Sequence, residues 1–217
     1  MHFFRSLSVG ARLWAGVIAI ILALFVVVAT AGSRSAMLNK ESEQVLSALA
    51  HKTTIATQWA GLTETNVTRV QASIASSDPA IAEMYKDMIP AGVAAISALQ
   101  KELQAMDMNE AEKAQMAKIA ELRKNVLDSL GKANEMKKAG DAAGAAQEIS
   151  IRFNQAVPPY LAALREFASM QSEIRQEAQT SFTEQRATSL TIATIQVGAL
   201  VAGIVAGAFF LIRNIRN

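Results

Sequence analysis

Polar side chains interrupt the apolar face of a long helical segment in the first third of the chain. Residues 59–73 read WAGLTETNVTRVQAS, and apolar positions recur before them at spacings of three and four. In the same register this face then reaches Asn66, Arg69 and Ser73. An arginine at a helix–helix contact loses hydration and needs an anion in return. Because arginine binds carboxylates through two parallel hydrogen bonds, the pattern predicts a site for a small organic acid.

Further polar residues are expected at the same depth of the later helices. A helical rise of ~1.5 Å per residue, counted from the expected helix ends, brings them to about the level of Arg69. Beside them, Pro158 and Pro159 deprive two helical carbonyls of their donors. The candidate ligand-binding residues are Thr65, Asn66, Arg69, Ser73, Ser129, Lys132, Arg152 and Asn154. The alternative is that Arg69 is a solvated rim residue that pairs with Glu64 or with a partner's acid.

Two uncharged segments that bracket this region are long enough to cross a membrane. They occupy residues 13–32 and 190–212, and ~20 helical residues span a hydrocarbon core. The first segment exceeds the ~7–15 apolar residues of a signal peptide, so we expect a retained span. Both segments together predict a protein embedded in a lipid bilayer.

Flanking arginines give the expected orientation. Arg5 and Arg12 precede the first segment, and Arg213 and Arg216 follow the second. Arginines in short flanks stay on the cytoplasmic side of a membrane. The expected division is a cytoplasmic tail at 1–12, spans at 13–32 and 190–212, an outer domain at 33–189 and a cytoplasmic segment at 213–217.

The outer region is expected to hold four helices. Its composition favours helix, and no run alternates as a strand would. The helices are expected at about residues 33–76, 79–104 with a kink at Pro90 and Gly92, 110–138, and from Asp141 into the second span. Short connections make neighbours antiparallel. The predicted fold class is therefore all-α, an antiparallel up-down-up-down four-helix bundle between two transmembrane helices.

The first helix of the outer region carries two apolar stripes. The first comprises Val45, Ala48, Ile55, Trp59 and Leu62, and the second Leu49, Ala56, Val67, Val70 and Ile74. One stripe is expected to enter the core and the other to meet the same helix of a second copy, which predicts a homodimer. Asn66, Arg69 and Ser73 would then lie towards the subunit seam.

No residue pattern in the chain indicates catalysis or metal binding. The chain has no cysteine, and its two histidines are expected on opposite sides of the membrane. No nucleophile-elbow, Walker or zinc-protease motif occurs. We expect no enzyme, no metal and no cofactor, and a net charge of +2 does not call for nucleic acid. Charged residues expected on solvated faces are Glu102, Glu110, Glu112, Lys113, Lys118, Glu121, Arg123 and Lys124.

This layout resembles the amino-terminal part of bacterial methyl-accepting chemotaxis receptors of the four-helix-bundle type. The basic entry FFRSLSVGARLWAG, the pattern of Trp59, Asn66 and Arg69, the stretch VPPYLAAL and the tail LIRNIRN carry the resemblance. It implies an inner-membrane receptor with a periplasmic ligand-binding domain and a tail at which a HAMP linker begins. The linker's remainder and the cytoplasmic signalling parts would lie beyond this chain.

The resemblance also implies Arg69 as the ligand anchor at the outer end of the bundle. Aspartate-type receptors place further arginines one to two turns away, where this chain has Glu64 and Ser73. The ligand therefore stays open among a dicarboxylate or other organic acid, an aromatic acid, an amino acid and a binding protein. Alternative functions for the chain are the sensor part of a histidine kinase or nucleotide cyclase, and a non-signalling membrane scaffold.

Overall fold

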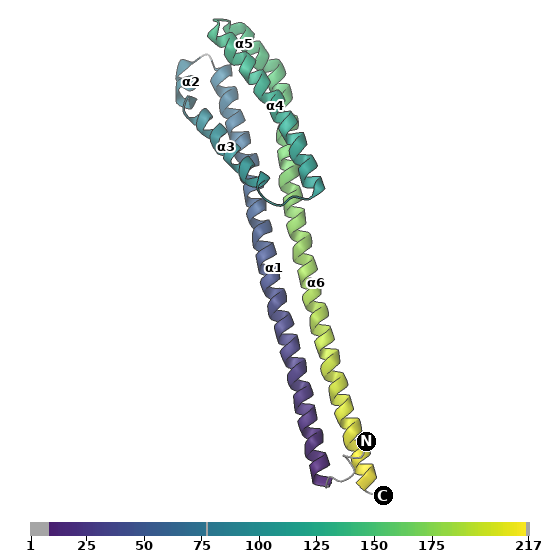
Figure 1. The fold of residues 1–217 in the computed structure, drawn as a ribbon. Coiled ribbons are helices and arrows are strands. Elements are labelled where there is room, and N and C mark those ends of the chain that lie inside the picture. Colours follow the sequence, from purple (N-terminus) through teal and green to yellow (C-terminus); the bar gives the residue numbers. More distant parts are fainter. Residues whose placement is uncertain (1–8, 77, 216–217) are drawn as a thin grey trace. The chain divides into compact units, whose positions relative to one another are not determined.

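Helices make up nearly all of the described part of the chain. The computed structural model describes residues 9–76 and 78–215, and no strand occurs among them (Figure 1). The elements in chain order are α1 (Val9–Ala75), α2 (Pro79–Tyr85), α3 (Met88–Gln104), α4 (Glu110–Lys138), α5 (Ala142–Glu148), the π-helical turn η2 (Ile149–Phe153) and α6 (Asn154–Ile215). The prediction of an all-α fold is confirmed.

The described residues divide into two units. The central unit is Leu46–Glu177, and the terminal unit comprises the described residues up to Val45 and from Ala178 onward. Helices α1 and α6 each have a part in both units. The outer domain expected at 33–189 extends beyond the central unit at both ends.

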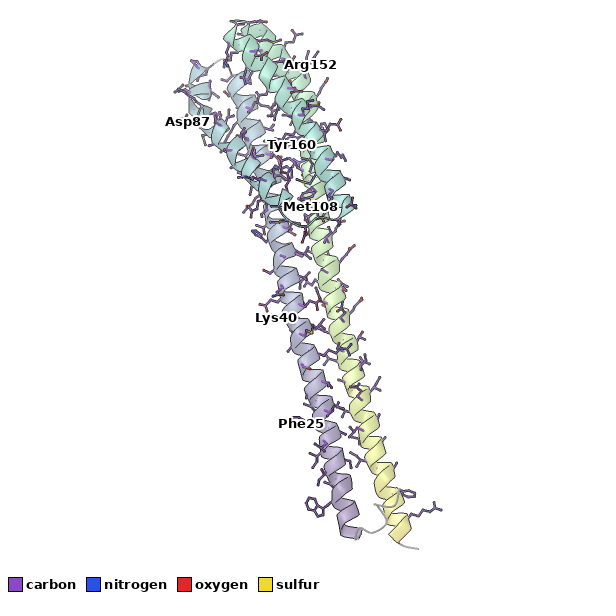
Figure 2. The ribbon with its side chains drawn as sticks, in the orientation of Figure 1. Phe25, Lys40, Asp87, Met108, Arg152 and Tyr160 are labelled. Atoms are coloured by element: carbon purple, nitrogen blue, oxygen red, sulfur yellow. The ribbon has the colours of Figure 1, made fainter. Side chains whose placement is uncertain are left out.

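The terminal unit contains the two apolar segments. Its helices are long and apolar enough to cross a membrane. No described residue in their most apolar stretches is buried inside the structure. Phe25, for example, is 71% exposed and points outward in Figure 2. Within this unit Arg186 Nη2 donates to Ser42 Oγ at 3.0 Å, which joins α6 to α1. So much exposed apolar surface is typical of a segment that meets lipid or another apolar partner.

One hydrophobic core holds the central unit together. It takes residues from α1, α3, α4, η2 and α6. Trp59 of α1 meets Phe167 of α6 edge to face, with ring centroids 6.2 Å apart. Neither ring is exposed to solvent. Burying two large aromatic side chains in this geometry stabilises the contact between the first and last helices.

Both apolar stripes of α1 contribute to this single core. Ile55 and Trp59 of the first stripe are buried, and so are Ala56, Val67 and Val70 of the second. The expectation that one stripe faces a second copy is therefore wrong for these residues. The buried face of α1 is wide because this helix packs against more than one helix of its own chain.

Local signals set the helix ends as expected. Asn109 accepts from the Glu112 N–H while the Glu112 carboxylate accepts from the Asn109 N–H, a complete capping box. At the other end of α4, Gly140 has φ +85°, and Asp141 N–H donates to the Met136 carbonyl at 3.0 Å. This is a Schellman motif, which needs a left-handed residue such as glycine.

The second expected helix is two helices. α2 ends at Tyr85 and α3 begins at Met88, where a kink was expected further on, at Pro90 and Gly92. The break lies where Pro90 would leave the Lys86 carbonyl without its helical donor. Because α3 begins at Met88, Pro90 lies in its first turn, where a backbone N–H would have no partner within the helix.

Helix α3 approaches α1 closely at Gly92. A Cβ built on Gly92 would lie 2.3 Å from Asn66 Oδ1, nearer than real Cβ contacts allow. Glycine at this position therefore lets the backbone of α3 lie against the Asn66 amide.

The substitution Gly92→Ala tests this approach against Gly131→Ala, whose added Cβ meets nothing within 4 Å. Alanine in an exposed helix interior raises stability by about 0.5–1 kcal/mol, so we expect Gly131→Ala to raise the melting temperature of the full chain in detergent. Gly92→Ala should melt roughly 2–4 °C below Gly131→Ala, because the Asn66 amide must move. Equal melting temperatures would contradict the close approach.

Candidate functional site

A cavity lies inside the central unit between α1, α3, α4 and the η2–α6 segment. Its volume is about 50 Å³. Its walls are formed by Thr63, Asn66, Val67, Val70, Val93, Ile96, Arg123, Val126, Leu127, Leu130, Phe153 and Tyr160. Most of these side chains are apolar, and four are polar. Leu127 is 44% exposed, so the wall on α4 reaches the surface.

Two polar side chains of α1 lie buried in the wall of this cavity. Thr63 is 3% exposed and Asn66 is 5% exposed. Asn66 Oδ1 has no hydrogen bond within the described part of the chain, and the Thr63 hydroxyl has only the Tyr160 phenol beside it. Leaving a buried polar atom without a hydrogen bond lowers the free energy of unfolding by ~1–3 kcal/mol. A core selected for stability alone would therefore contain few such atoms. A guest with polar groups can supply the missing partners.

Arg123 of α4 supplies the positive charge of the cavity wall. Its guanidinium donates to Gln100 Oε1 and, at 2.9 Å, to Ser97 Oγ, both on α3. No carboxylate pairs with it among the described residues, and it is the only charged residue of the wall. Arg123 is half-buried, so the expectation that it belongs to a solvated face holds only in part: its side chain also contacts α3 and lines the cavity.

Tyr160 of α6 completes the polar side of the wall. It is 3% exposed and lies among the helices of the central unit in Figure 2. Burial raises the pKa of its phenol above the ordinary 10.0, and the nearby Arg123 guanidinium and Thr63 hydroxyl offset only part of that rise. The phenol is therefore a neutral hydrogen-bond donor at physiological pH.

Of the eight ligand-binding residues predicted from sequence, only Asn66 lines the cavity. Arg69 and Ser73 are half-buried elsewhere on α1, and Arg69 has no ion pair among the described residues. Thr65 is exposed and donates to the Gly61 carbonyl. The expectation that Asn66 lies towards a subunit seam is wrong, since it faces its own core.

The predicted residues of the later helices also lie off the cavity. Ser129 is buried and donates to Glu148 Oε1 at 3.1 Å, and Arg152 is exposed beside the same carboxylate at 3.6 Å. Asn154 is exposed and accepts from Gln71 Nε2 at 2.9 Å. Lys132 is exposed. Ser129 and Arg152 therefore both contact Glu148, Asn154 contacts Gln71, and none of the four predicted residues lines the cavity.

Three polar wall residues were missed by the sequence reasoning, although their spacing carries a signal. Trp59, Thr63 and Asn66 follow one another at intervals of four and three, so Thr63 belongs to the buried face. Arg123 has the same relation to the buried Ile119 and Val126. A charged or hydroxyl residue in register with buried apolar residues predicts an interior position.

A second polar cluster is buried elsewhere in the central unit. Lys52 of α1 and Glu112 of α4 form an ion pair at 2.9 Å, with side chains only 10% and 4% exposed. Gln171 Nε2 of α6 donates to the same carboxylate at 2.8 Å, and Lys52 also donates to the Asp107 carbonyl. The expectation that Glu112 lies on a solvated face is therefore wrong. Glu112 thus accepts from Lys52, Gln171 and the Asn109 N–H, and the cluster joins α1, α4 and α6, although Gln171 Oε1 is itself buried without a partner among the described residues.

The comparisons with known proteins give no relative for this chain: no protein-family model matches it, and neither does any curated protein.

The Glu112 pair predicts a pH dependence of stability. Burial by itself raises the pKa of Glu112, but the Asn109 N–H, Lys52 and Gln171 together outweigh it and hold the pKa below 4.5. A lowered pKa in the folded state stabilises the protein above the unfolded value, and this contribution is lost as pH falls through the folded pKa.

The substitution Glu112→Gln should lower the free energy of unfolding at neutral pH by about 3 kcal/mol, because it leaves Lys52 buried without its anion. The matched change Glu110→Gln, in the same helical turn but exposed, should leave the melting temperature nearly unchanged. Thermal unfolding across pH should show the difference between wild type and Glu112→Gln shrinking below pH 4.5. A difference that stays constant at low pH would contradict the assignment.

Proposed function

We propose that this chain is the sensor part of a two-pass bacterial chemoreceptor of the inner membrane. The central unit stands in the periplasm as an up-and-down four-helix bundle and binds a small organic ligand in its cavity. The observation that carries the proposal is a cavity with a buried, unpaired amide oxygen on α1 and a cation without an anion on α4. A sensor needs such an incomplete site, whereas a scaffold has no use for it.

The ligand acts by joining helices. Its polar groups meet Thr63 and Asn66 of α1, Arg123 of α4 and Tyr160 of α6. A bound ligand therefore favours the arrangement in which these side chains converge, and only such a difference in affinity between two states can move the protein. Packed helices that switch between two arrangements shift by ~1–2 Å.

The shift leaves the central unit along α6. This helix runs without interruption from Asn154 to Ile215, through the apolar segment expected to span the membrane. Arginines at the cytoplasmic flanks of both segments support the proposed orientation. The same mechanism would serve the sensor part of a histidine kinase or a nucleotide cyclase.

Association of two copies through α1 is part of the proposal. The described part of α1 keeps Leu62 of the first stripe 39% exposed, whereas its neighbours Ile55 and Trp59 are buried. Leu62 therefore remains available to a second copy. The cavity itself lies within one chain, so ligand binding does not require the partner.

One experiment in two parts tests the proposal. The chain has no cysteine, so Lys132→Cys and Asn217→Cys each introduce a single thiol. In intact spheroplasts an impermeant maleimide should label Lys132→Cys, which is exposed on α4, and should reach Asn217→Cys only after the membrane is opened. Labelling of both thiols from outside would contradict the two-pass orientation.

The second part is a thermal-shift screen of the full chain in detergent with organic acids, amino acids and their neutral amides. A ligand at 100 times its dissociation constant adds ~2.7 kcal/mol to the free energy of unfolding, which is readily measured as a higher melting temperature. At least one compound should raise it. If none does, the scaffold alternative replaces the sensor.

A further inference from the structure

We infer that the cavity binds a short hydroxy monocarboxylate, with its carboxylate on Arg123 and its hydroxyl at Asn66. This inference rests on the proposed function and names the ligand class of the same site. It moves the anchor from Arg69, which the sequence suggested, to an arginine that lines the cavity.

The charge of the wall selects one carboxylate. Arg123 is its only charged residue, and the guanidinium uses only neutral acceptors, Gln100 Oε1 and Ser97 Oγ. Those two bonds leave three of its five N–H groups for another acceptor. One cation in a mostly apolar wall balances one anionic group, and a second carboxylate would stay buried and unpaired. A dicarboxylate is therefore a poor fit.

The unpaired amide oxygen of Asn66 selects a hydroxyl. Asn66 Oδ1 is an acceptor without a donor, and a ligand hydroxyl supplies one. The Thr63 hydroxyl and the protonated phenol of Tyr160 lie beside each other, and either can donate to a carboxylate. A hydroxy acid thus satisfies Asn66 Oδ1 while its anion meets Arg123.

The size of the cavity selects a short chain. On the measure that gives about 50 Å³ here, one water needs ~10–15 Å³, so there is room for roughly four waters. Four waters occupy ~120 Å³ of liquid, which is roughly the space of a molecule with three or four carbons. The remaining walls, Val67, Val70, Val93, Ile96 and Val126 among them, offer that carbon chain an apolar surface.

The test is calorimetric titration of the full chain in detergent with each enantiomer of sodium lactate. The comparison ligands are lactamide, propionate and succinate. We expect one lactate enantiomer to bind tightest, lactamide to bind roughly 10- to 100-fold more weakly for want of the charge, and propionate to bind more weakly for want of the hydroxyl. If lactamide or succinate bound as tightly as lactate, the inference would be overturned.

Matched variants locate the site. Arg123→Gln should weaken lactate binding roughly 10- to 100-fold, whereas Arg69→Gln, a second half-buried arginine that does not line the cavity, should leave it within about twofold. Thr63→Val removes the hydroxyl beside the Tyr160 phenol at nearly constant volume. It should weaken lactate binding while lowering the melting temperature by roughly 2–4 °C at most, for the loss of one hydrogen bond. Weakening by Arg69→Gln in place of Arg123→Gln would overturn the assignment without relying on the fold of one variant.

Failure of this inference differs from failure of the sensor proposal. If lactate does not bind at millimolar concentration but another compound does, and Thr63→Val weakens that compound, the cavity is a ligand site and the ligand class is wrong. If no compound of the wider panel binds, both the ligand class and the sensor are wrong.

Discussion

One amide oxygen, Asn66 Oδ1, buried in an apolar interior without a partner among the described residues, is the constraint on which this account depends. Thr63 Oγ1 and Asn66 Oδ1 lie on the face of α1 that also carries Trp59 and Val67. The surrounding fold holds this face inside: the Trp59–Phe167 contact fixes α1 against α6, and Gly92 lets α3 approach the Asn66 amide.

The central unit holds the buried Lys52 and the half-buried Arg123 differently, and the contrast points to function. Lys52 is paired with Glu112, which also accepts from Gln171, so its charge is fully compensated. Arg123 has only the neutral oxygens of Gln100 and Ser97 among the described residues. A compensated buried pair fixes how helices meet, whereas an uncompensated cation beside a cavity attracts an anion.

Helix ends and fold class could be predicted from the sequence because their causes are local. Asn109 and Glu112 form their box within one turn, and Gly140 ends α4 by its own φ angle. The site could not be predicted as well, because the inward face of α1 depends on how many helices surround it. Placing one of its stripes at a subunit seam made Arg69 the anchor, whereas the packed core turns Thr63 and Asn66 inward.

The most direct measurement uses the two tyrosines of the chain, Tyr85 on α2 and Tyr160 at the cavity. Fluorotyrosine labelling gives two ¹⁹F resonances, assigned by Tyr85→Phe. Titrating small organic acids into the full chain should shift the Tyr160 resonance saturably and leave the Tyr85 resonance in place. A Tyr160 resonance that no organic acid moves, or a shift confined to Tyr85, would contradict the claim that the cavity is the ligand site.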